Sequence, residues 1–144
     1  MVTVRQMTDS DVGSVGRLEA ENFSAPWSEN AFREMLRIDY AHYYVAEDEG
    51  RIAGCCGLLH VADEGEITNM SVSMADRRQG IASMLLDCIL TEGATLGIKA
   101  FTLEVRAGNQ PAIELYHKFG FKGVGERRNF YEKPRENALI MWKR

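Results

Sequence analysis

The sequence predicts a single mixed α/β domain. Short apolar segments with the composition of strands alternate along the chain with segments whose apolar residues recur at helical spacing. The length of 144 residues suits one domain with one sizeable core. The chain contains no repeats, low-complexity tracts or linker-like stretches that would divide it, so we assign residues 1–144 to one domain.

The first half of the chain carries two predicted helices among four predicted strands. Thr8 and Ser28 are the expected N-caps of the helices, and Pro26 interrupts the helical pattern between them. Tight turns are expected at residues 49–50 and 63–65. The predicted strands are residues 3–6, 43–46, 52–61 and 67–72.

The second half carries two more predicted helices. The longer one begins after Gly80 and is expected to stop near Gly97. The other opens at Asn109 with Pro111 in its first turn and ends at Gly120, the usual placement of proline and glycine at helix ends. The predicted strands of this half are residues 100–105, 122–129 and 138–142.

Composition and patterning argue against membrane and secreted proteins. The longest apolar run, residues 52–59, is far shorter than the ~20 residues that span a bilayer. The amino terminus lacks the basic and then apolar pattern of a signal peptide. The three cysteines have no Cys-x-x-Cys spacing, and Cys55 and Cys56 should point to opposite faces of a strand. We therefore expect a cytoplasmic protein with reduced, packed cysteines.

The net charge of −4 argues against non-specific nucleic-acid binding and is compatible with a basic protein or peptide partner. Four acids could attract such a partner, although solvent exposure alone would explain them: Glu19, Glu21, Asp63 and Glu64. The three histidines have no metal-ligand spacing, so no metal site is expected. The expected oligomeric state is a monomer.

The strongest functional signal lies between residues 69 and 86. A predicted strand leads through Arg77 and Arg78 into a turn at Gly80 that opens the long helix. The first helical turn has backbone N–H groups without partners, and the helix dipole adds positive potential there. Gly80 and Ala82 leave this turn nearly bare, so a phosphate could approach the backbone. The turn fits a pyrophosphate site, although ordinary turn chemistry explains it equally well in isolation.

Three residues further along sharpen this interpretation. Glu104 ends a predicted buried strand, and Asn109 follows that strand at the mouth of the next helix. Tyr116 lies seven residues, or about two turns, after Asn109, so both lie on roughly one helix face. Glu104 alone would suit a surface acid and Tyr116 alone a core-edge aromatic. Their spacing from Asn109 and Gly80 favours a catalytic pair.

Residues 77–82 resemble the cofactor motif Arg/Gln-x-x-Gly-x-Gly/Ala of the GCN5-related N-acetyltransferases (GNAT). Further segments resemble the RimI-type branch, which acetylates the N-terminal alanine of ribosomal proteins: LEVR-x-x-N, AIELY-x-x-x-GF, RRNFY and PWS. The resemblance covers nearly the whole chain. It implies the GNAT fold, a single mixed, mostly antiparallel sheet with a splayed pair of parallel central strands and about four flanking helices.

The sequence departs from the family pattern at a few positions. Ala82 stands where many relatives have glycine, and Gly108 where serine is common. Met70 and Ser71 replace a more usual apolar Ile-Ala pair. These changes keep the backbone contacts available.

The resemblance implies acetyl-CoA as co-substrate. Backbone groups of Met70, Ser71 and Val72 would bind its acetyl and pantetheine portion, with the Val72 N–H polarising the thioester carbonyl. Asn109 would hydrogen-bond the pantetheine arm. The pyrophosphate would be held by Arg77, Arg78, Gln79, Gly80, Ile81, Ala82 and Ser83.

The resemblance also assigns the chemistry and the acceptor site. Glu104 would act as general base, through a water, and Tyr116 would return a proton to the departing thiolate. Trp27 could line the acceptor cleft or cover the core. Tyr131 could contact the acceptor backbone or pack within a hairpin.

The leading functional prediction is an Nα-acetyltransferase acting on the N-terminal alanine of a small-subunit ribosomal protein. An N-terminal amine with a pKa near ~8 is roughly a fifth deprotonated near neutral pH, against about a thousandth for a lysine near ~10.4. A carboxylate base therefore has an easier task with a protein N-terminus. The alternatives are an acetyltransferase of lysine side chains or small amines, and a non-catalytic acyl-CoA-binding module. The presence of both Glu104 and Tyr116 argues against the second.

Overall fold

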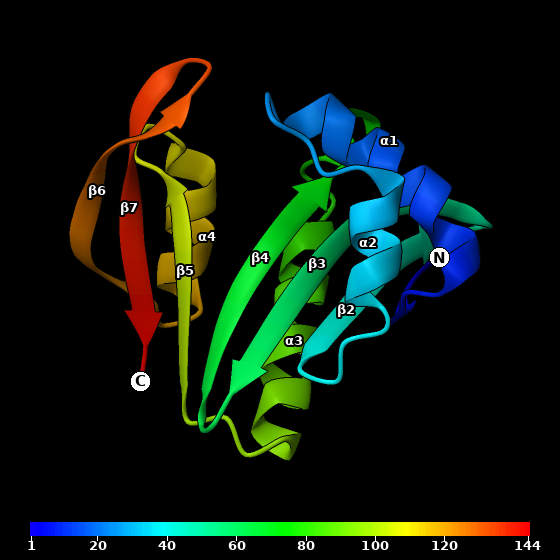
Figure 1. The fold of residues 1–144 in the computed structure, drawn as a ribbon, viewed down its shortest axis with the longest axis horizontal. Coiled ribbons are helices and arrows are strands. Elements are labelled where there is room, and N and C mark those ends of the chain that lie inside the picture. Colours follow the sequence, from blue (N-terminus) through cyan, green and yellow to red (C-terminus); the bar gives the residue numbers. More distant parts are fainter.

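The computed structural model describes residues 1–144 and contains one seven-stranded sheet flanked by four α-helices (Figure 1). The strands are β1 (Val2–Gln6), β2 (Ala41–Asp48), β3 (Arg51–Val61), β4 (Glu64–Val72), β5 (Ala100–Arg106), β6 (Lys122–Glu132) and β7 (Arg135–Lys143). The helices are α1 (Val12–Asn22), α2 (Glu29–Met35), α3 (Ile81–Thr95) and α4 (Gln110–Lys118), with short 3₁₀ turns at Asp9–Asp11 and Met74–Asp76. None of the helices is long and apolar enough to cross a membrane.

The strand order is β1-β2-β3-β4-β5-β7-β6, and every neighbouring pair is antiparallel except β4 and β5. These two strands pair in parallel only where Glu64–Glu66 lie beside Ala100–Thr102. Beyond that point they diverge, as Figure 1 shows. The expected mixed, mostly antiparallel sheet with a splayed central pair is therefore confirmed.

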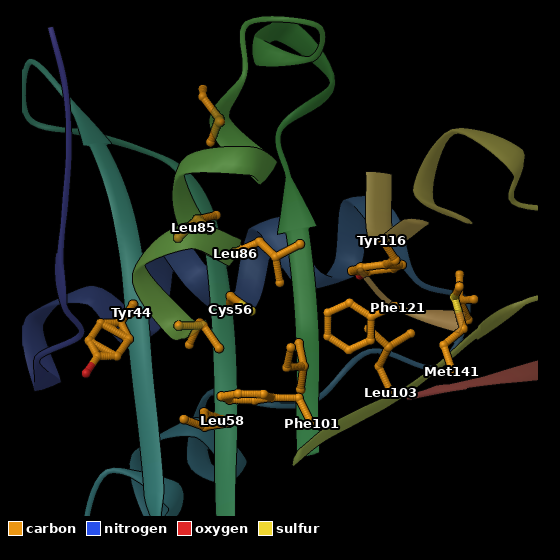
Figure 2. Packing of buried hydrophobic residues seen from close by; sticks show 14 of the residues in the cluster. Tyr44, Cys56, Leu58, Leu85, Leu86, Phe101, Leu103, Tyr116, Phe121 and Met141 are labelled. Atoms are coloured by element: carbon orange, nitrogen blue, oxygen red, sulfur yellow. The ribbon is translucent and has the colours of Figure 1, made fainter. Parts of the chain in front are cut away.

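Two apolar cores cover the two faces of the sheet. The larger one lies between the sheet and helices α3 and α4, and Figure 2 shows it running from Tyr44 to Phe121 and Met141. The smaller one lies under α1 and α2 and includes Val15 and Phe32. Cys55 belongs to the smaller core and its neighbour Cys56 to the larger, which confirms that they point to opposite faces. All three cysteines are free.

Gly54 on β3 allows α3 to approach the sheet beside the end of β4. A Cβ atom at this position would lie 3.0 Å from a methyl carbon of Leu85 on α3 and 3.0 Å from the Ser71 carbonyl oxygen on β4. Contacts this short with a backbone atom are not tolerated without movement of the strand. The absence of a side chain at Gly54 thus allows α3 to lie close against β3.

Most predicted elements are present, but the turn predicted at residues 63–65 is wrong. The β3–β4 turn consists of Ala62 and Asp63, and Glu64 and Gly65 are already paired with β3. Ala62 adopts the left-handed conformation with φ 55°, which closes the hairpin in two residues. A Cβ on Gly65 would crowd Leu58 and Ile98, so this glycine serves packing against the core.

Two other boundaries differ from the prediction. The helix expected after Thr8 begins as a 3₁₀ turn, in which the Asp11 carboxylate accepts a 2.8 Å hydrogen bond from the Thr8 N–H. The same carboxylate pairs with Arg5 at 2.8 Å, which joins the turn to β1. Strands β6 and β7 are longer than predicted because they form one continuous hairpin that turns at Lys133–Pro134.

Candidate active site

The turn before α3 is open toward solvent. Gly80 is the N-cap of α3 with φ 78°, and no side chain caps the first turn. A Cβ built on Gly80 would meet no atom within 4 Å, but the positive φ itself favours glycine. Arg78 also adopts a left-handed conformation, with φ 65°. The free N–H groups of this turn, with two arginines beside them, form a site suited to an anion.

A cavity of about 560 Å³ lies beside this turn, between β4 and α4; we call it the α3 cavity. The predicted catalytic residue Tyr116 lines this cavity. All the predicted cofactor-binding residues line it as well, with the exception of Gln79. Sequence analysis missed further residues in its walls: Asn22, Phe23, Asp76, Pro111, Ala112 and Leu115. Pro111, Ala112 and Leu115 lie on the helix that carries Asn109 and Tyr116. Their helical spacing from these two residues could have indicated that they line the same cavity.

Strand β4 reaches this cavity because its partner β5 has diverged. Past Glu66, the edge of β4 that faces β5 has no paired strand, and Met70, Ser71 and Val72 line the cavity. Helix α1 holds this part of β4 from the other face, where the Asn22 side chain donates a 2.8 Å hydrogen bond to the Ser71 hydroxyl. The side-chain oxygen of Asn22 in turn accepts a hydrogen bond from the Arg77 guanidinium.

Helix α4 supplies the opposite wall. Asn109 is its N-cap, and the side-chain oxygen accepts a hydrogen bond from the Ala112 N–H at 3.3 Å. Tyr116 is 5% exposed and lies edge-on to Phe121 with ring centroids 5.8 Å apart, as Figure 2 shows. Burial raises the pKa of the Tyr116 phenol, so the hydroxyl stays protonated over the ordinary pH range.

A second cavity, also about 560 Å³, lies between the α1–α2 segment and the β6–β7 hairpin; we call it the hairpin cavity. Both predicted acceptor residues, Trp27 and Tyr131, line it. Trp27 also packs on Phe32 of the smaller core with ring centroids 5.3 Å apart, so it lines the cavity and covers the core at once. Phe23 lines both this cavity and the α3 cavity, so the two share a wall.

Glu104 lines neither cavity. Its neighbours Leu103 and Val105 point into the larger core, so Glu104 points to the opposite face of β5, away from α4. Its carboxylate pairs with the Arg127 guanidinium of β6 at 3.1 Å, and the side chain is 21% exposed. Burial and the nearby Glu104 charge together raise the pKa of Glu66 on β4. Glu104 and Tyr116 therefore flank the divergence of β4 and β5 from opposite faces of the sheet.

The expectation that Glu19 is a solvent-exposed acid is wrong. Glu19 is 3% exposed and lines the hairpin cavity. The sequence indicated this burial through helical spacing. Glu19 lies seven residues after Val12 and four after Val15, so it shares the buried helix face of these two residues. Arg106, another lining residue that the sequence analysis missed, lies two positions after Glu104 and so on the same face of β5.

Comparison with known proteins identifies the family. The sequence model of the Acetyltransferase (GNAT) family matches residues 13–121. The chain belongs to this family.

Similar proteins span almost the whole of this GNAT chain. The ribosomal protein bS18-alanine N-acetyltransferase of Escherichia coli (strain K12) is 32% identical over 143 residues, which cover 98% of this chain and 96% of that protein. A Bacillus subtilis (strain 168) protein, whose name assigns the same activity provisionally, is 39% identical over 140 residues, covering 96% and 93% of the two chains. The crystal structure of the ribosomal-protein-S18-alanine N-acetyltransferase from Escherichia coli has a TM-score of 0.91 at 30% identity and covers 99% of this chain and 93% of that chain.

GNAT acetyltransferases use acetyl-CoA, and the α3 cavity fits this co-substrate. The uncapped start of α3, with open space above Gly80 and with Arg77 and Arg78 beside it, suits a pyrophosphate. The cavity continues from there along β4 to Tyr116, which suits a narrow thioester arm. The structure contains no cluster of three or more His, Cys, Asp or Glu side chains that could hold a metal ion.

An ion pair between the exposed Arg51 side chain and the buried Asp76 lies just before the Gly80 turn of this GNAT domain. Asp76 is buried just before the turn and accepts two hydrogen bonds from the Arg51 guanidinium, both 2.6 Å long. These bonds hold the pKa of the Asp76 carboxyl below its usual range. Because Asp76 also lines the α3 cavity, its charge would repel a pyrophosphate if Arg51 did not balance it.

We therefore expect Arg51→Ala to raise the dissociation constant of acetyl-CoA severalfold with little change in kcat. Asp76→Asn should have the smaller effect, because it removes the repelling charge together with the ion pair. Calorimetric titration with acetyl-CoA checks both. Arg33→Ala is the matched control, since Arg33 pairs at 3.7 Å with an exposed Asp9 at a distance from the cavity. Equal affinity of the Arg51 variant and the wild type would contradict this account.

Arg106 joins the walls of the hairpin cavity. Its guanidinium pairs with Glu136 at 3.2 Å, donates to the Pro134 carbonyl oxygen at 2.9 Å and lies 4.4 Å from the centre of the Tyr131 ring. A longer hydrogen bond, 3.4 Å, reaches the Ser24 hydroxyl of the α1–α2 segment. One side chain thus sets the position of Tyr131 relative to both segments.

We expect Arg106→Ala to raise KM for the acceptor by about tenfold or more, as the loss of charge-assisted hydrogen bonds would, and to change KM for acetyl-CoA little. Arg106→Lys should restore little, because an ammonium cannot reproduce the planar stack and the paired bonds. Steady-state kinetics with each substrate varied in turn checks this. Arg128→Ala, on the same hairpin but exposed, serves as the control. A defect confined to acetyl-CoA would refute the assignment.

Proposed function

We propose that this GNAT enzyme acetylates the N-terminal amine of a small-subunit ribosomal protein that begins with alanine. The observation that carries the proposal is the pair of cavities on the two sides of the diverging strands, which share a wall at Phe23. Acetyl donor and amine acceptor can therefore be bound at the same time and meet between β4 and β5. The names of the bacterial relatives suggest the acceptor class.

The acetyl group passes directly from the thioester to the amine in a ternary complex. Glu104, through a water, takes the proton that the ammonium must lose before its nitrogen can form the new bond to the acetyl carbon. Tyr116 supplies a proton to the sulfur as the carbon–sulfur bond breaks. The two residues approach the divergence of the strands from opposite faces, so each can serve one end of the transfer. Backbone groups of Met70–Val72 and the side chain of Asn109 hold the thioester arm.

The wall of the hairpin cavity suits an extended polypeptide. Trp27 and Tyr131 present large rings, and the segments that carry them lie on either side of the cavity. We propose that the enzyme acts as a monomer. A ribosomal protein acceptor places the reaction in the cytoplasm.

The decisive experiment offers the enzyme two peptides in competition. One has a free N-terminal alanine and no lysine, and the other is N-blocked and contains a lysine. We expect acetyl-CoA-dependent acetylation of the free N-terminus, measured by mass spectrometry, together with stoichiometric release of the CoA thiol. Preference for the blocked peptide would indicate a lysine or small-amine acetyltransferase instead. Binding of acetyl-CoA without acceptor-dependent thiol release would indicate a non-catalytic acyl-CoA-binding module.

A further inference from the structure

Glu19 is a buried carboxylate that lacks a counter-ion. It is 3% exposed, and no Arg, Lys or His side chain lies within ion-pair distance of it. Its Oε1 atom accepts a 3.1 Å hydrogen bond from the side chain of Asn69. Oε2 is buried and makes no hydrogen bond of normal geometry, although the nearby Trp27 backbone N–H favours the ionised carboxylate. A buried carboxylate in this state is costly unless a charged partner arrives.

The surrounding network fixes Glu19 as an acceptor. The side-chain oxygen of Asn69 accepts hydrogen bonds from the Tyr43 hydroxyl at 2.8 Å and the Thr68 hydroxyl at 3.1 Å. That oxygen is therefore occupied, and the amide group of Asn69 faces Glu19 as a donor. Asn69 itself is held with φ 54° at an irregularity in the β3–β4 pairing, so the network cannot easily rearrange.

Glu19 Oε2 lies on the side of the molecule that carries the hairpin cavity, the proposed acceptor site. Glu19 and Thr68 both line the hairpin cavity, and Thr68 lies on β4 two residues before Met70 of the α3 cavity. Glu104, on the same side, already has its charge balanced by Arg127. Glu132 also lines the hairpin cavity without an ion pair, but its side chain is exposed to solvent. Glu19 is thus the buried and unbalanced negative charge in the wall of this cavity.

We propose that Glu19 is the counter-ion for a cationic nitrogen of the acceptor, either its α-ammonium or a basic side chain that follows it. The proposal rests on the proposed function, because it takes the hairpin cavity as the acceptor site. It assigns to Glu19 a binding role that is distinct from the proton transfer of Glu104.

Glu19 Oε2 has almost no surface accessible to water, and Phe23, Ser24, Ala25 and Trp27 line the same cavity. Entry of a cation to Oε2 would require residues 23–27 to move outward. The only side-chain hydrogen bond between residues 23–27 and the strands across the cavity is the 3.4 Å contact between Ser24 and Arg106 of β5. Burial raises the pKa of the Glu19 carboxyl, while the Asn69 side chain and the Trp27 amide act in the opposite direction. A bound cation would also lower the pKa of the Glu19 carboxyl and so stabilise its ionised form.

The test is Glu19→Gln, which keeps an oxygen for the Asn69 hydrogen bond and removes the charge. We expect the dissociation constant of the acceptor peptide to rise about 10- to 100-fold, in line with the loss of a charged hydrogen bond, while that of acetyl-CoA is unchanged. The melting temperature should stay the same or rise, because an uncompensated buried charge has been removed. Glu21→Gln, an exposed position on the same helix, is the matched control. Binding is measured by calorimetry with CoA present, so the readout does not require turnover.

Two peptides separate the sources of the cation. One begins Ala-Ala and the other Ala-Arg, and both lack further basic residues near the N-terminus. An equal loss of affinity for both identifies the α-ammonium, and a larger loss for Ala-Arg identifies the side chain. Unchanged affinity for both peptides would overturn the proposal. If the wild type acts only on an N-blocked lysine peptide, the proposed function fails, and the same comparison with that peptide still decides whether Glu19 binds a cation.

Discussion

Replacing Glu104 with glutamine is expected to lower kcat by about 10²–10⁴-fold, the usual contribution of a general base. Glutamine has nearly the same shape as glutamate but cannot take the proton of the ammonium. Glu104 does not line the α3 cavity, so the dissociation constant of acetyl-CoA should not change. Single-turnover rates and calorimetry separate the two quantities.

The pH dependence makes this test specific. As pH rises past the acceptor amine pKa of about 8, more acceptor arrives already deprotonated, so the defect of Glu104→Gln should shrink. A residue that only shaped the site would give a constant defect. Glu126→Gln, at an exposed position on strand β6, controls for the loss of one negative charge. A near-normal rate at pH 7, or a defect seen only in acetyl-CoA affinity, would remove Glu104 from the mechanism.

The parts of the site that follow one local pattern could be predicted from the sequence. The turn at Gly80 depends on one strand, one glycine and one helix that are adjacent in the chain, so its residues carry the whole signal. The same holds for Asn109 and Tyr116, which helical spacing brings to one cavity. The splayed sheet followed from the family resemblance, and the structure confirms it.

The parts that depend on distant segments could not be predicted. The ion pair of Arg51 with Asp76 joins residues 25 positions apart, and that of Glu104 with Arg127 depends on the order in which β5, β7 and β6 pair. No local pattern encodes either contact. Glu19 is a different case, because helical spacing placed it on the buried face and its acidic character alone suggested exposure. A buried acid that lines a cavity is a candidate functional residue.

Tyr116→Phe is expected to lower kcat by about 10²-fold, through loss of the proton donated to the departing thiolate. The fold should be unaffected, because phenylalanine keeps the edge-on contact with Phe121 and Tyr116 is already part of the larger core. The affinity for acetyl-CoA should change little. Tyr40→Phe, which removes an exposed hydroxyl, is the matched control, and stopped-flow detection of the free thiol measures the step.

The environment of Tyr116 predicts how this defect varies with pH. Burial raises its pKa, so the donating form persists as pH rises, and the wild type should show no alkaline fall in kcat below pH of about 10, the pKa of an unperturbed tyrosine. The sulfur carries no ionisable proton before the carbon–sulfur bond breaks, so the thiol pKa of about 8.5 describes the released product and not the cleavage step. The Tyr116→Phe defect should therefore stay constant with pH while the wild-type phenol is protonated. A defect that vanishes below pH of about 10 would mean that Tyr116 is not the proton donor. The pH profile of kcat also distinguishes the two proposed catalytic residues. The loss of kcat in Glu104→Gln follows the pKa of the acceptor amine, so its pH dependence should shift when a different acceptor is used. The loss of kcat in Tyr116→Phe should not shift with the acceptor.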